Sequence, residues 1–287
     1  MNVVLPEKEK IPKQRIIIYV TIMIICIISI AVVIGVQVLG NDIVDNIFGI
    51  NKITKRSEEE EAELKTNFEN IFDNNTEYKD EYQTSKIEDD KEIIYTDYSK
   101  QEKTDNYEMN VNLPYINIEN EYAKKFNKEI ESTFKEKAEE ITKSTNKNII
   151  YTVKYKATIE KNIMSLIIYS DLKQETSAQR VIIQTFNYDL QNNKELTLED
   201  TMENYKLKKN EVQDKINKDI KEEQRKTEEL KNLGYNIFTR DTESDIYKVE
   251  NISEYFIYNN NIYIIFAYGN DRITSEMDLV ISNYPPA

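Results

Sequence analysis

Residues 149–159, with the sequence IIYTVKYKATI, alternate between apolar and polar side chains. All of the odd-numbered positions are apolar, whereas all but one of the even-numbered positions are Thr or Lys. Successive side chains of a β-strand point to opposite faces, so a period of two residues predicts a strand with one buried and one solvated face. Strands of this kind are typical of antiparallel sheets.

The segment before this strand has a different period. Its apolar side chains recur every three or four residues and are Ile118, Tyr122, Phe126, Ile130, Phe134, Ala138 and Ile141. This spacing predicts a helix whose apolar stripe faces the core.

Further strand patterns lie on both sides of this unit. Before it, residues 93–95 begin a strand. Residues 107–113 form another, which we expect to end at Pro114 because proline cannot donate to a sheet ladder. After it, residues 164–169 and 181–190 are rich in apolar and β-branched side chains and predict two more strands.

The C-terminal third again places a helical region before strands. The sequence TLED at 197–200 fits a capping box that begins a helix, and the apolar spacing continues to a C-cap at Gly234. The strands expected after it are a hairpin around Asn259–Asn261 and one final strand, at residues 255–258, 262–268 and 277–281.

Helices separated by runs of consecutive strands indicate an α+β domain, in which antiparallel sheets pack with helices. The sequence FNKEI at 126–130 resembles INKDI at 216–220, and each lies in a predicted helix that precedes a hairpin. Either a helix-plus-sheet unit has been duplicated, or the match is a coincidence in a chain rich in Asn, Lys and Ile.

Residues 16–39, IIIYVTIMIICIISIAVVIGVQVL, contain no charged side chain. At about 1.5 Å per helical residue this run crosses a hydrocarbon core of about 30 Å, which predicts a transmembrane helix in contact with membrane lipid. A cleaved signal peptide is the alternative, but its apolar core is usually about 7–15 residues and the end of this run is a poor cleavage site.

The charges that flank this run predict its orientation. Lys13 and Arg15 precede it, and Asp42 and Asp45 follow it, so the positive-inside rule places the N-terminus in the cytoplasm. We therefore expect a single-pass protein of the cell membrane. Its expected parts are a cytoplasmic tail at 1–15, the transmembrane helix at 16–39, an acidic stalk at 40–91 and an extracytoplasmic domain at 92–287.

The expected stalk holds most of the negative charge. Residues 41–105 contain 19 acidic and 9 basic side chains, in a chain whose net charge is −14. A short amphipathic helix is predicted within it, with an apolar face of Leu64, Phe68, Ile71 and Phe72. This helix lies on the membrane or on the domain, or it binds a partner.

Composition excludes several classes of function. The chain has no His, no Trp and a single Cys, which removes most side chains that perform acid–base, nucleophilic and transition-metal chemistry near neutral pH. With 38 basic against 52 acidic residues, it lacks the basic surface that binds nucleic acid. We therefore expect no enzyme, no cofactor, no metal ligand and no nucleic-acid partner.

Two matches to S-x-x-K, at 132–135 and 144–147, raise the question of a serine–lysine mechanism. The companion motifs S-D-N and K-T-G are absent, and Phe134 within the first match belongs to the core stripe. A hydrolase that uses two of the many carboxylates stays open as the enzyme alternative.

Asp241, Glu243 and Asp245 have the spacing of a calcium loop. The sixth position is Ile246, where an EF-hand needs Gly, and the twelfth is Ile252, where it needs a bidentate Glu. A solvated turn is the better interpretation.

Aromatic side chains are frequent in the predicted strands. The residues in question are Tyr151, Tyr155, Tyr255, Tyr263 and Tyr268. Packing in the core explains such positions, and a platform for stacking glycans is the alternative.

Four segments together resemble a known domain family. They are VNLPYI at 111–116, FNKEI at 126–130, FNYDL at 186–190 and KELTLED at 194–200. The chain is similar here to the extracytoplasmic domain of lysozyme-responsive anti-sigma factors, and to the non-catalytic N-terminal part of some peptidoglycan deacetylases. The family often has a Gly-Gly-Ala-His loop where this chain has ETSAQ at 175–179, and the sigma-binding and catalytic domains are missing.

The resemblance implies an anchored extracytoplasmic binding or sensing protein of the bacterial cell surface. Its ligand is expected to be a protein, and the acidic charge favours a basic one such as lysozyme. The alternatives are a peptidoglycan-binding module and a structural envelope protein without catalytic activity. No residue pattern identifies the ligand-binding residues.

Overall fold

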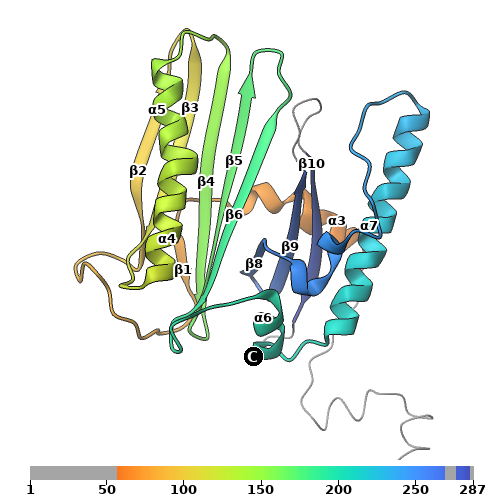
Figure 1. The fold of residues 1–287 in the computed structure, drawn as a ribbon. Coiled ribbons are helices and arrows are strands. Elements are labelled where there is room, and N and C mark those ends of the chain that lie inside the picture. The colour runs from red at the N-terminus through yellow and green to blue at the C-terminus, as the bar shows by residue number, and fades with distance from the viewer. Residues whose placement is uncertain (1–56, 269–275, 285–287) are drawn as a thin grey trace, which may run out of the picture. The chain divides into compact units, whose positions relative to one another are not determined.

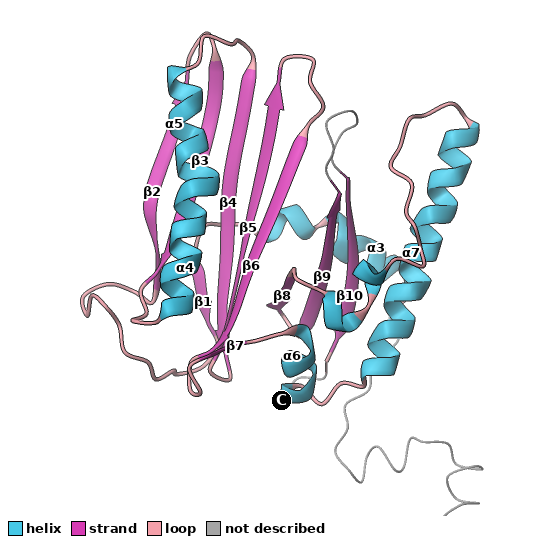
Figure 2. Ribbon diagram, viewed as in Figure 1, coloured by secondary structure: helices cyan, strands magenta, loops and turns pink. Residues whose placement is uncertain are grey.

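Two β-sheets and the helices packed on them form the described part of the chain (Figures 1 and 2). The computed structural model describes residues 57–268 and 276–284. One sheet has seven strands and the other has three, and most strand pairs are antiparallel. The predicted α+β class, with antiparallel sheets packed with helices, is confirmed.

The large sheet has the order β2-β3-β4-β5-β6-β7, and β1 also pairs with β4. β3 and β1 both run parallel to β4, along different halves of the same edge. A parallel pair needs a crossover, which the helices between β3 and β4 supply. The strands are β1 (Thr76–Tyr78), β2 (Ile94–Lys103), β3 (Tyr107–Ile116), β4 (Ile149–Glu160), β5 (Ile163–Gln174), β6 (Arg180–Asp189) and β7 (Lys194–Glu195).

One face of this sheet is covered by α4 (Glu121–Ile130) and α5 (Glu136–Lys143), which a π-helical turn joins at Glu131–Lys135 (Figure 1). The predicted stripe from Phe126 to Ile141 is buried against the sheet, together with the odd-numbered side chains of β4. Tyr122 is the exception, because its side chain is 48% exposed. The alternation of 149–159 and the helical stripe are therefore two sides of one core.

The small sheet has the order β10-β9-β8 and is apolar on both faces. Even-numbered side chains of β9 pack with α6 and α7, whereas Tyr263 and Ile265 pack with Phe68, Phe72 and strands of the large sheet. The capping box at Thr197 is confirmed. These elements are α6 (Leu198–Asn204), α7 (Lys209–Asn232), β8 (Tyr255–Tyr258), β9 (Asn261–Tyr268) and β10 (Glu276–Asn283).

The two sheets are joined by hydrogen bonds at the edge of β8 that faces away from β9. Side chains of β4, β5 and β6 bind the backbone of this edge. Thr158 Oγ1 donates to the Ile257 carbonyl (2.8 Å), the Ile257 N–H donates to Ser165 Oγ (2.9 Å), and Asn187 Nδ2 donates to the Tyr255 carbonyl (2.8 Å). Ser165 Oγ also donates to Asn187 Oδ1 at 2.5 Å. Thr158, Ser165 and Asn187 are buried, so each satisfies a backbone group that water cannot reach.

Asparagine supplies most of the left-handed backbone positions in this glycine-poor chain. At 57–268 and 276–284, the non-glycine residues with positive φ are Asn74, Asn148, Lys161, Asn162, Glu175, Asn193, Lys206, Asn259 and Asn260. Asn tolerates this region better than other side chains, and two such residues in succession suit a two-residue hairpin turn. The predicted hairpin of β8 and β9 turns at Asn259 and Asn260 for this reason.

Residues 57–91, which we expected to belong to a stalk, are packed on the domain instead. The predicted amphipathic helix is present as α3 (Glu58–Thr66) and a 3₁₀ turn at Phe68–Ile71, and the Phe68 and Phe72 side chains are buried between the sheets. The next residues add β1 to the large sheet. The boundary expected at 92 therefore differs from the structure, because a polar sequence does not reveal pairing with a distant strand.

A buried lysine fastens this N-terminal segment to β4. Lys156 is 3% exposed, and its ammonium bonds Asp73 Oδ2 at 2.9 Å and Asn75 Oδ1 at 2.8 Å. Glu77 lies 3.6 Å from the same ammonium. Burial opposes ionisation of Glu77, but Lys79 and Lys156 outweigh it and lower the pKa of that carboxyl. The segment thus supplies the charges that make a buried ammonium tolerable.

The expected tail at 1–15, the expected transmembrane helix at 16–39 and the first part of the expected stalk lie outside the described residues. Among residues 57–268 and 276–284, no helix is both long and apolar enough to span a membrane.

Replacing Asn187 with Ala should destabilise the protein by about 2–4 kcal/mol, because the Tyr255 carbonyl and the Ser165 hydroxyl lose a buried partner. Chemical denaturation measures the change. Asn192, whose side-chain bond to Asp189 is exposed, is the matched control, and Asn192→Ala should cost less than about 1 kcal/mol. Equal losses in the two variants would contradict the role given to Asn187.

A chain that begins at Glu92 should be far less stable than one that begins at Lys52. The shorter chain leaves Lys156 buried without its carboxylates and exposes the apolar surface under Phe68 and Phe72. Thermal unfolding of the two chains checks this. Equal melting temperatures would show that residues 57–91 are not an integral part of the domain.

Candidate functional site

The segment that contains β1 and its connection to β2 carries an excess of acidic side chains. Residues 73–92 contain eight acidic and three basic side chains. The fully buried Asn117 shapes this connection: its Oδ1 accepts from the N–H groups of Ile87 and Glu88, and its Nδ2 donates to the carbonyls of Glu88 and Glu92. A buried amide thus holds the backbone, and most of the carboxylates point outward.

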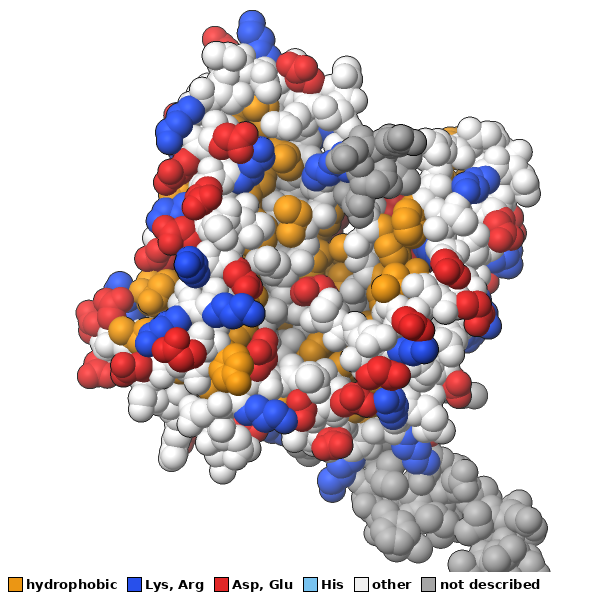
Figure 3. Space-filling model, in the orientation of Figure 1, with side chains coloured by type: hydrophobic (Ala, Val, Ile, Leu, Met, Phe, Trp, Pro, Cys, Tyr) orange, Lys and Arg blue, Asp and Glu red, His pale blue; other side chains and the backbone are white. Residues whose placement is uncertain are grey.

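Five carboxylates of this connection make no ion pair with any residue at 57–268 or 276–284. We call them the acidic rim, and they are Asp80, Glu81, Asp89, Asp90 and Glu92. On the helices, by contrast, many acids pair with a lysine or arginine one turn away. Figure 3 shows acidic side chains gathered over this connection, at the lower left of the molecule.

Two tyrosines stand among these carboxylates. Tyr78 and Tyr82 are stacked with ring centres 5.7 Å apart and an angle of 18° between the planes. They line an open hollow of about 440 Å³ together with Asp80, Glu81 and Glu92, and we call it the tyrosine hollow. The Tyr78 hydroxyl donates to Glu92 Oε2 at 2.7 Å, and the Tyr78 side chain is 40% exposed.

The phenols of this hollow are neutral. Burial, and then the bond to Glu92, raise the pKa of Tyr78, and burial together with the charge of Glu92 raises the pKa of Tyr82. The charge of the hollow therefore comes from its carboxylates alone. An anionic hollow with aromatic walls suits a cationic group.

These residues were not among the candidates predicted from the sequence, where the region is polar and without a clear period. The signal that could have found them is YKDEY at 78–82, in which two tyrosines flank two acids and a lysine. Tyr78 is the last residue of the short strand β1 and therefore lies at the edge of the large sheet, and Tyr82 packs on the main core. The pairing of β1 with β4 fixes the position of Tyr78, and packing on the core fixes that of Tyr82.

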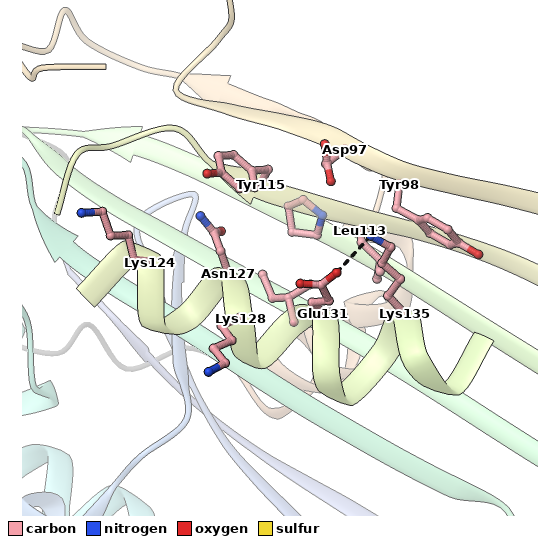
Figure 4. A pocket seen from close by; sticks show the side chains of 11 residues that line it. Asp97, Tyr98, Leu113, Tyr115, Lys124, Asn127, Lys128, Glu131 and Lys135 are labelled. Atoms are coloured by element: carbon pink, nitrogen blue, oxygen red, sulfur yellow. Dashed lines mark hydrogen bonds and ion pairs between the residues drawn. The ribbon is translucent and has the colours of Figure 1, made fainter. Parts of the chain in front are cut away.

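A second hollow, of about 260 Å³, lies between β2, β3 and α4, and we call it the bulge pocket (Figure 4). The register of β2 and β3 shifts beside Pro114, and Asp97 is the extra residue of a β-bulge. Proline has no N–H for the ladder, and a bulge is a place where a sheet accepts that loss. We had expected β3 to end at Pro114, but it continues through Pro114 to Ile116.

The bulge pocket carries charges of both signs that are largely bonded within the chain. Lys135 bonds Glu131 at 3.1 Å, which raises the pKa of that lysine. The Asn127 side chain spans α4 and β3, since it accepts from the Ile116 N–H and donates to the Ile116 carbonyl, each at 2.9 Å. Lys128 points away from β2 and Asp97 (Figure 4). The pocket thus offers a ligand charges of both signs, whereas the charged side chains of the tyrosine hollow are all acidic.

The S-x-x-K matches do not form serine–lysine pairs. Ser132 Oγ donates to the Glu129 carbonyl, while Lys135 bonds Glu131. In the second match, Ser144 Oγ accepts from the Asn146 N–H.

The acidic loop that resembled a calcium site is a turn in the structure. The Glu243 N–H donates to Asp241 Oδ1, and Asp245 begins a 3₁₀ turn and pairs with Lys248. Within the described ranges, no three Asp, Glu, His or Cys side chains gather as a metal site would require.

The strand tyrosines lie in the core. All five are at most 9% exposed, namely Tyr151, Tyr155, Tyr255, Tyr263 and Tyr268. Burial raises the pKa of Tyr151 to about 12. Their faces are covered, so the packing interpretation holds for these residues and the glycan platform does not.

Comparisons with known proteins give weak likenesses only. No protein-family model and no curated protein matches the chain. A solved structure of a DUF3298 family member from Bacteroides fragilis is 12% identical, with a TM-score of 0.32 over 62% of this chain and 81% of the other. A DUF3298 family protein from Pseudomonas aeruginosa is 9% identical, with a TM-score of 0.36 over 72% of this chain and 99% of the other. Scores this low support no argument, so the resemblance found in the sequence stays a prediction.

Asn127→Ala should destabilise the protein by about 2 kcal/mol, because the N–H and carbonyl of Ile116 both lose their partner. The midpoint of urea unfolding measures the loss. Asn110 lies on the same strand with an exposed side-chain bond, so Asn110→Ala serves as the control and should change stability little. An unchanged midpoint for Asn127→Ala would show that this amide does not fasten α4 to β3.

Proposed function

We propose that this chain is a membrane-anchored extracytoplasmic protein that binds or senses a basic protein at the bacterial cell surface, without catalytic activity of its own. The observation that carries the proposal is the acidic rim, whose five carboxylates have no ion-pair partner at 57–268 or 276–284. The uncharged run at 16–39 supports the anchor, and the flanking charges support the orientation.

Unpaired carboxylates on one surface favour a basic partner over an anionic one. They attract a basic protein during diffusional encounter and raise its association rate at low salt, whereas they repel anionic wall polymers. Lysozyme is the partner that the sequence resemblance implies, and its positive charge fits this surface. A sensor needs no chemistry at such a site, because a ligand that binds one state of a protein more tightly shifts the population toward that state.

A peptidoglycan-binding module is the competing candidate. Uncharged glycan chains are bound by exposed aromatic faces, and those faces are few in the described residues, where Tyr78, Tyr122 and Tyr235 are the tyrosines that are clearly exposed. Tyr78 lies among carboxylates, which favours a cation at that ring over a neutral sugar.

Calorimetry of the full chain in a non-ionic detergent, against lysozyme and against purified peptidoglycan, tests the proposal. We expect lysozyme to bind, and to bind more weakly as salt shortens the screening length from about 30 Å at 0.01 M to about 8 Å at 0.15 M. We also expect no turnover of peptidoglycan. Salt-insensitive binding of peptidoglycan without binding of lysozyme would overturn the proposal in favour of the wall-binding module.

A further inference from the structure

We propose that the tyrosine hollow is the seat for one arginine side chain of the basic partner, and that Tyr78 is the residue on which this side chain stacks. The inference rests on the proposed function and assigns the recognition site within it. The hollow is built from two rings and three carboxylates, and nothing else lines it.

The lining of the tyrosine hollow differs in charge from that of three other hollows in the described residues. The bulge pocket contains Lys124, Lys128 and Lys135, and two further hollows contain Lys248 and Lys161. In those three hollows, a lysine of the chain itself repels an incoming cation and competes with it for the carboxylates. In the tyrosine hollow it meets carboxylates and aromatic rings alone.

The geometry favours a guanidinium over an ammonium. Arginine is planar, stacks on an aromatic ring and binds a carboxylate through two parallel N–H groups, whereas lysine presents a compact and strongly hydrated charge. The hollow offers both surfaces together, since the ring of Tyr78 is joined to the Glu92 carboxylate by a hydrogen bond. A phenol that donates to an anion also has a more electron-rich ring, which attracts a cation more strongly.

The residues of the seat have fixed positions without a ligand, so the site is preorganised. Tyr78 belongs to β1, which pairs with β4, and Tyr82 packs on the main core. Asp80 Oδ2 accepts from the Lys161 N–H at 2.8 Å, which fixes the turn between the two tyrosines. A preorganised site binds with a smaller loss of side-chain entropy.

Two sets of matched substitutions test the seat, with the full chain in a non-ionic detergent and lysozyme as the probe. Tyr78→Leu should weaken binding about five- to tenfold, and Tyr78→Phe, which keeps the ring, should stay within about threefold of the unchanged protein. Tyr122→Leu removes another exposed tyrosine and should change affinity less than about twofold. Glu81→Gln should slow association at low salt, whereas Glu139→Gln, an equal charge change on α5, should slow it less.

Lysozyme whose arginines are blocked by a dicarbonyl reagent completes the test. This arginine-blocked lysozyme should bind the unchanged protein and the Tyr78→Leu variant with the same weak affinity. Lysozyme with acetylated lysines should still bind the unchanged protein more tightly than the variant. Melting curves confirm that each variant is folded. If lysozyme binds the unchanged protein and Tyr78→Leu with the same affinity, the seat is refuted and the proposed function stands. If lysozyme does not bind the unchanged protein at low salt, both fail.

Discussion

The structure depends on the hydrogen bonds that pair the free backbone groups along one edge of β8. A sheet edge is a row of unpaired N–H and C=O groups, and burying it without partners costs about 1–3 kcal/mol for each group. Here the edge of the small sheet is set against the face of the large one, where Thr158, Ser165 and Asn187 bind its backbone. Glu254, which precedes β8, adds to these hydrogen bonds between the sheets, since its carboxylate accepts from both the N–H and the hydroxyl of Thr185 in β6. Apolar contacts alone would join the two sheets without fixing their register.

This arrangement also determines where the acidic surface lies. The face of β4 that carries Thr158 toward β8 carries Lys156 as well, and that ammonium holds the acidic segment through Asp73. β1 then follows β4 and carries Tyr78 to the tyrosine hollow. One strand thus positions the small sheet with one side chain and the acidic connection with another. The lysines of this segment are already engaged, since Lys79 pairs with Glu77, Lys91 pairs with Glu88 and Lys86 donates to two carbonyls. They leave the acidic rim without an ion-pair partner among the described residues.

Sequence periodicity predicted most helices and strands. It did not predict the features that depend on contacts between residues far apart in the sequence. The buried odd-numbered face of 149–159, the stripe from Phe126 to Ile141 and the capping box at Thr197 were confirmed, since each reflects local geometry. The even-numbered face of 149–159 was predicted to be solvated, but Lys156 and Thr158 are buried, because the N-terminal segment and the small sheet cover them. The continuation of β3 past Pro114 was not predictable, because it depends on a bulge in the neighbouring strand. Residues 73–92 gave no signal of order, since their partners are Lys156 and Asn117. The tyrosine hollow was missed for the same reason, as its two rings come from this segment.

Hydrogen exchange of the full chain, with and without lysozyme, tests the central claim that the acidic connection is the recognition surface. Buried backbone amides at an interface exchange more slowly than free ones. We predict slower exchange between residues 78 and 92 when lysozyme is present, with α4 and α5 unchanged. Protection confined to α4 and the bulge pocket, or no protection at 78–92 despite measurable binding, would contradict it.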